Sequence, residues 1–152
     1  MGLIAELLFY HLERDPLDRV LPQLVARSLE RSWRCLVRVT HGERAEALDR
    51  LLWSWRDDSF LPHGLATAPH ADRQPVLISE SADNLNGANV LFSVDGAAID
   101  DAGAYDRTVY LFDGHDTEAV ANARTVWRWG KEQSLELTYW QQSDAGQWQK
   151  RA

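Results

Sequence analysis

Short apolar runs alternate with amphipathic segments along most of this chain, and this alternation restricts the folds that it can adopt. Runs such as Leu36-Val37 and Val76-Leu77-Ile78 lack a polar residue at every second position, which is typical of strands buried on both faces. Between these runs, apolar residues recur at the three- and four-residue spacing of a helix. The pattern predicts an α/β fold with a mostly parallel central sheet flanked by helices.

The chain has 152 residues and shows no internal repeat or second core, so we expect a single domain covering residues 1–152. The first helix should begin at Asp15-Pro16, or near Pro22 if that proline interrupts it. The tail around Trp148 should return as a short hairpin. Strands are expected at 4–11, 34–40, 75–80, 89–95, 107–112 and 135–141. Further helices are expected at 43–55 and 116–132. Loops should lie at 67–74 and 81–87, and a short connector at 100–106.

Composition excludes several classes of function. The net charge of −7 disfavours strong direct nucleic-acid binding, because a broad grip on a phosphate backbone takes many Lys and Arg residues. No apolar run approaches the roughly 20 residues that a membrane span requires. The apolar N-terminus lacks a basic leader and a cleavage site, and therefore predicts a first strand. The single cysteine, Cys35, lies in an apolar run and predicts a buried, inert thiol in a reducing cytoplasm.

The predicted fold is Rossmann-like, yet the chain has no nucleotide-binding motif. No G-x-G-x-x-G follows the first strand, and no G-x-x-x-x-G-K-[ST] occurs. No two histidines stand four residues apart, and Cys35 has no thiol partner, which argues against structural zinc. We expect no catalytic residue, cofactor or metal.

Two histidines leave an alternative open. His63 and His115 follow predicted helices or strands, where a hydrolytic or metal cluster could form with Asp57, Asp58, Asp113 or Asp116. The simpler interpretation is that His63 orders the loop at 60–62. Asp113 and Asp116 would then only flank a helix N-terminus, where negative charge is favourable.

The last predicted helix carries a basic stripe beside an aromatic residue. Arg124 and Arg128 are four residues apart, Lys131 follows three residues later, and Trp127 and Val120 lie beside them. Guanidinium groups bind carboxylates through two hydrogen bonds, and a tryptophan face adds apolar contact area. An acidic peptide that ends in a hydrophobic residue and a free carboxylate would fit this stripe. The alternative is a solvated charged face with Trp127 lying over it.

Residues 51–66, LLWSWRDDSFLPHGLA, combine the end of an amphipathic helix with a loop rich in large apolar groups. Such groups are usually covered by the core or by a partner. The string LLW–SFLPHGLA resembles the chi subunit family of the bacterial DNA polymerase III clamp loader, and residues 120–142 resemble that family's last helix and strand.

The resemblance implies a non-catalytic adaptor with two protein partners. In the family, a basic residue, two spacers, an aromatic and a second basic residue mark the docking site for the acidic tail of single-stranded DNA-binding protein. Arg124, Trp127 and Arg128 match these positions. Val120 stands where some relatives have another basic residue, and Gly130 departs from the usual continuation.

The segment around the second helix end implies the other partner, the psi subunit, with Trp53, Phe60 and Pro62 as the contact residues. Trp53 could instead belong to the core, with Phe60 pinning the loop. A competing interpretation, a nucleotide hydrolase or phosphotransferase on an α/β fold, requires a phosphate loop or clustered carboxylates.

Overall fold

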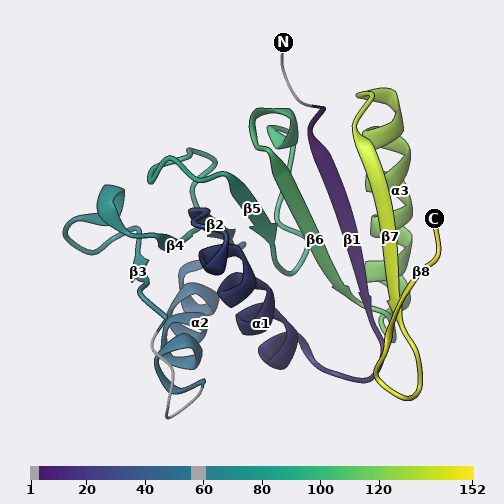
Figure 1. Ribbon diagram of the computed structural model, residues 1–152, viewed down its shortest axis with the longest axis horizontal. Coiled ribbons are helices and arrows are strands. Elements are labelled where there is room, and N and C mark those ends of the chain that lie inside the picture. Colours follow the sequence, from purple (N-terminus) through teal and green to yellow (C-terminus); the bar gives the residue numbers. More distant parts are fainter. Residues whose placement is uncertain (1–3, 56–60) are drawn as a thin grey trace.

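A computed structural model describes residues 4–55 and 61–152, which form an eight-stranded sheet with helices on both faces (Figure 1). The strand order is β3-β4-β2-β5-β6-β1-β7-β8, and every neighbouring pair is parallel except β7 and β8. The predicted α/β fold with a mostly parallel sheet is therefore confirmed. The strands are β1 (Glu6–Leu12), β2 (Cys35–Arg38), β3 (Gly64–Leu65), β4 (Val76–Ser79), β5 (Val90–Ser93), β6 (Arg107–Asp113), β7 (Glu136–Gln142) and β8 (Trp148–Lys150).

Three longer helices cover the sheet: α1 (Leu17–Glu30), α2 (Gly42–Ser54) and α3 (Thr117–Glu132). Apolar residues of α1 and α2 pack in one core, whereas α3 packs in a second core on the opposite face. Successive side chains of β1 point alternately to the two faces, so Leu7 and Phe9 join the core under α3. Among the described residues, no helix is long and apolar enough to cross a membrane.

The start of α1 corrects one prediction. The helix begins immediately after Pro16 and continues through Pro22, which is buried on the side that faces the sheet. Pro22 lies in the second turn, so it removes only the hydrogen bond to the Asp18 carbonyl, and burial of its ring offsets part of that loss. Asp15 does not cap the helix as expected: its carboxylate accepts from Gln142 Nε2 at 2.7 Å and from Arg19 at 3.5 Å.

Smaller elements lie where the sequence predicted loops. Gly64 and Leu65 form the short edge strand β3, and a 3₁₀ turn, η1 (Ala71–Arg73), lies within the predicted loop at 67–74. The predicted connector at 100–106 contains a second 3₁₀ turn, η2 (Ala102–Ala104). The predicted return of the tail is confirmed, because β8 pairs antiparallel with β7 and Gln142 lies opposite Trp148.

A buried arginine holds together the loops that follow β4 and β5. The Arg38 guanidinium donates to the carbonyls of Ser81, Ala82 and Ala98 and to both carboxylate oxygens of Asp101, at 2.7 and 3.0 Å. The hydrogen bonds from Arg38 lower the pKa of Asp101. The pair stabilises the fold above the usual carboxyl pKa, and this contribution is lost as the pH falls through the lowered pKa of Asp101.

Gly130 lets α3 lie close to the sheet. A Cβ atom at this position would come within 2.8 Å of Leu137 Cδ2 and 3.0 Å of Leu7 Cδ2. Leu7 is fully buried, so its methyl group has little room to move. The glycine therefore lowers helix propensity but permits close packing of α3 against β1 and β7.

Replacing Gly130 with valine should test this packing. We expect Gly130→Val to lower the free energy of unfolding by about 1–3 kcal/mol, because the added side chain overpacks the core. Gly103→Val is the matched control, since nothing lies within 4 Å of a Cβ atom there, and should change stability by no more than about 0.5 kcal/mol. Chemical denaturation of both variants measures the difference; equal values would contradict the close approach.

Candidate functional site

The basic stripe predicted on the last helix is present on the exposed side of α3. The side chain of Asp116 caps the helix by accepting from the backbone amides of Glu118 and Ala119. Arg124, Arg128 and Lys131 are exposed. Apart from a long contact between Arg128 and Thr125 at 3.4 Å, the two arginine side chains make no hydrogen bond or ion pair with the described residues. Their donors are therefore free for a ligand.

Trp127 does not lie over a solvated face, as the alternative interpretation of the stripe had it. It is half-buried, and its ring centroid lies 5.3 Å from that of Phe9 and 5.9 Å from that of Tyr139. Lys131 Nζ lies 5.8 Å from the Trp127 ring centroid, which is within cation–π range. Trp127 thus anchors α3 to the sheet and presents only part of its ring beside the stripe.

Tyr139 belongs to this site although the sequence analysis did not select it. It lies on β7 against Trp127, and its hydroxyl is 2.6 Å from His11 Nδ1. Burial raises the pKa of Tyr139, and the positive charge of Arg124 partly offsets the rise. An aromatic residue on the strand after the stripe was a visible signal, but its face became known only with the register of β7. Val120 is half-buried against the second core and adds apolar area beside the stripe.

The second predicted surface lies at the end of α2. Trp53 is 56% exposed, and its ring centroid lies 4.8 Å from that of His63. Pro62 is half-buried beside them, whereas Leu61 is buried. Phe60, Asp57 and Asp58 lie outside the described residues. The placement of Trp53 favours the surface interpretation over the core interpretation.

His63 orders the segment that precedes β3, as the simpler interpretation expected. Its Nδ1 lies 2.6 Å from the Leu61 carbonyl oxygen, and its Nε2 lies 3.2 Å from both the carbonyl and a carboxylate oxygen of Asp49. The ring is buried, so these contacts connect the loop to α2.

The two surfaces lie at opposite ends of the sheet (Figure 1). Helix α2 packs on β4 and β3 near one edge, and α3 packs on β6 and β7 toward the other. The helices also cover opposite faces.

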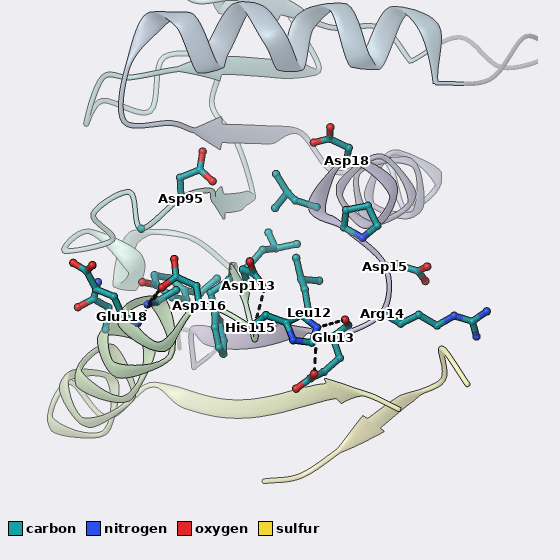
Figure 2. Close-up of a pocket in the computed structure, with 18 of the residues that line it drawn as sticks. Leu12, Glu13, Arg14, Asp15, Asp18, Asp95, Asp113, His115, Asp116 and Glu118 are labelled. Atoms are coloured by element: carbon teal, nitrogen blue, oxygen red, sulfur yellow. Dashed lines mark hydrogen bonds and ion pairs between the residues drawn. The ribbon is translucent and has the colours of Figure 1, made fainter. Parts of the chain in front are cut away.

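A crevice of about 720 Å³ opens at the carboxyl ends of β1 and β6 (Figure 2). The chain leaves β1 through α1 toward β2 and leaves β6 through α3 toward β7, so the connections diverge at these neighbouring strands. Doubly wound folds commonly bind ligands at such a point. Here the lining is acidic, with carboxylates from Glu13, Asp15, Asp18, Asp95, Asp113, Asp116 and Glu118.

Internal contacts use part of this acidic lining. Arg44 pairs with Asp95 at 2.7 Å and with Asp18 at 3.8 Å. His115 Nε2 donates to the Glu13 carbonyl oxygen at 2.6 Å, and this bond raises the pKa of His115. Asp113 accepts from the His115 amide instead of its ring.

The metal or hydrolytic cluster that could have joined His63 to His115 does not form between them, because His63 lies with Asp49 at the far end of the sheet. No group of three metal-ligating side chains occurs in the parts of the chain that the structure describes.

The described features define a doubly wound α/β protein with an acidic crevice at its switch point and a basic stripe on its last helix. Residues 4–138 match the family model described as DNA polymerase III chi subunit, HolC. The chain therefore belongs to the DNA polymerase III chi subunit family.

One curated relative is the probable DNA polymerase III subunit chi of Rickettsia prowazekii (strain Madrid E). It is 26% identical over 82 residues, which cover 54% of this chain and 50% of the relative. The match thus spans about half the length of that relative.

The different burial of Trp127 and its basic neighbours predicts different effects on stability. Trp127→Ala should lower the free energy of unfolding by about 2 kcal/mol or more, because it leaves a cavity between Phe9 and Tyr139. Arg124→Ala and Arg128→Ala should each change it by less than about 0.5 kcal/mol, because both side chains are exposed. Urea denaturation measures all three; a stability loss as small for Trp127 as for the arginines would show that the ring is not part of the core.

Proposed function

We propose that this chain is a non-catalytic adaptor that binds the acidic C-terminal tail of single-stranded DNA-binding protein through α3. The observation that carries the proposal is the pair of exposed arginines, Arg124 and Arg128, beside the partly exposed ring of Trp127. Two guanidinium groups one turn apart match carboxylates of an acidic segment. Val120 and Trp127 offer apolar contact to a hydrophobic end residue, and Lys131 adds charge at the stripe's end.

The second part of the proposal is that the Trp53 surface binds the psi subunit. Trp53, Pro62 and Phe60 would supply apolar contacts, and Trp is among the residue types that dominate protein interfaces. Support comes from the 56% exposure of Trp53 at a helix end, beside the His63 ring that contacts the Leu61 and Asp49 carbonyl oxygens. With both partners bound, this chain would couple the clamp loader to single-stranded DNA that is coated with its binding protein.

The nucleotide hydrolase alternative loses support at the crevice. Seven carboxylates line the place where a doubly wound fold would hold phosphates, and they repel a polyphosphate chain. Of the cationic residues in the described lining, Arg14, Arg44 and His115, the last two already contact protein oxygens.

The tail site predicts a loss of binding upon charge reversal. Arg124→Glu or Arg128→Glu should cost about 1.5–3 kcal/mol of affinity for a peptide with the acidic tail, since each removes a charge-assisted contact and adds repulsion. Wild-type binding should weaken as the salt concentration rises. Calorimetric titration measures both effects. Arg73 is an exposed arginine on η1, and Arg73→Glu is the control that makes the same charge change elsewhere. An equal loss of peptide affinity in this variant would show that the effect comes from the change in net charge alone.

The two-surface arrangement predicts independent binding. Phe60→Ala and Trp53→Ala should each weaken psi binding by more than about 1 kcal/mol if they are anchors, and should leave tail affinity unchanged. Arg128→Glu should do the reverse, and the combined variant should show additive losses within about 0.5 kcal/mol. Titration of psi into the chain with and without saturating tail peptide tests this directly. Competition between the two ligands would mean that they share one site.

A further inference from the structure

A second, smaller pocket lies on the opposite face of the sheet from α3, between the C-terminal half of α1 and strands β1, β5 and β6. Its volume is about 130 Å³. The floor is apolar and consists of Leu8, Leu24, Phe92 and Val109. The pocket shares no lining residue with the acidic crevice or with α3.

Three arginines surround this floor. Arg107 donates from Nε to Glu6 Oε2 at 2.8 Å, whereas neither Arg27 nor Arg31 has a carboxylate oxygen within 4 Å among the described residues. The guanidinium carbons of Arg31 and Arg107 each lie 5.0 Å from the ring centroid of Trp33. Two of the three guanidinium groups are thus exposed and form no ion pair with the described residues.

Tyr10 adds a hydroxyl to the same pocket. Its ring packs edge-on against Trp148 at a centroid distance of 5.0 Å, and its hydroxyl bonds no other described residue. Tyr10 lines the pocket together with Arg107, Arg27 and Arg31. Burial raises the pKa of Tyr10, and the charges of these three arginines partly offset the rise. The Ser28 hydroxyl, also in the lining, is already used by the Leu24 carbonyl. The polar groups left at the pocket are therefore hydrogen-bond donors.

We propose that this pocket binds a carboxylate of an acidic peptide, with Arg27, Arg31 and the Tyr10 hydroxyl as donors and a neighbouring apolar side chain of the peptide on the floor. Exposed guanidinium groups that form no ion pair attract an anion, and an apolar floor of this size accommodates one side chain. A nucleic-acid strand fits less well, because it carries a negative charge at every nucleotide and this chain has a net charge of −7. The proposal does not rest on the function assigned to α3.

A purely structural role for Arg27 and Arg31 is the alternative that the experiment must distinguish from peptide binding. Arg27 lies in the last turn of α1 and Arg31 follows its end, where positive charge stabilises a helix. A purely structural role predicts that their replacement changes stability without changing peptide binding.

The experiment titrates a short synthetic peptide of aspartates, ending in leucine and a free carboxylate, into the Arg124→Glu/Arg128→Glu chain. That background removes the stripe on α3, so binding to it does not contribute. The indole N–H signal of Trp33, assigned with Trp33→Phe, reports the pocket by NMR, and the signal of Trp127 in the wild-type chain reports α3 separately. Failure at one site is thereby distinguished from failure at the other.

We expect a saturable shift of the Trp33 signal in this background. Adding Arg27→Gln and Arg31→Gln should weaken the affinity roughly tenfold or more, because charge-assisted contacts are lost while the side-chain stems remain. Tyr10→Phe keeps the ring and should weaken it by about two- to tenfold. Arg19→Gln, on the same helix but outside the pocket, should change nothing.

An unmoved Trp33 signal in the wild-type pocket, or equal affinity after both glutamine substitutions, would overturn the proposal. So would tighter binding of an oligothymidine than of the peptide at Trp33, because the pocket would then be a nucleic-acid contact.

Discussion

The packing of α3 against β1 and β7 is the interaction on which the proposed tail site depends. Phe9, Trp127 and Tyr139 form a cluster of rings between helix and sheet, with centroid distances of 5.3, 5.9 and 6.1 Å. Gly130 permits the close approach one turn later. Because Trp127 packs on side chains of two adjacent strands, its neighbours on the helix have a fixed direction, and Arg124 and Arg128 project from a rigid support instead of a mobile surface.

Periodicity predicted most elements because each is set by residues close together in the chain. The continuous apolar runs of β2 and β4 and the helical spacing in α2 and α3 are local signals of burial on two faces or one. The edge strand β3 was missed because two residues carry no periodic pattern, and its pairing depends on β4. Pro22 misled the prediction of α1 because it removes only one hydrogen bond near the start of the helix, and burial of its ring, a tertiary effect, offsets part of that loss.

The candidate sites could be predicted only in part, because residues distant in the sequence contribute to them. The stripe on α3 was visible as a spacing within one helix, and Trp53 as a large apolar residue at a helix end. The burial of Trp127 depends on β1 and β7, which are distant in sequence. The arginine pocket joins Arg27 of α1 to Arg107 of β6, and no local pattern relates them. The pocket forms because α1 packs over β6 as the chain returns toward β2. That crossing depends on the order of the strands in the sheet.

The strand order also separates the charges of this acidic chain. Carboxylates gather where β1 and β6 end. Arg27 and Arg31 lie at the C-terminal end of α1, which runs antiparallel to the strands and so lies toward their starting ends. The basic groups of α3 lie on the other face. Adjacent strands from β4 to β7 are hydrogen-bonded to one another, so these regions cannot shift relative to one another without breaking the sheet. A scaffold of this kind would suit the proposed adaptor, because it would hold the partners at fixed separations and let each bind to its own rigid surface.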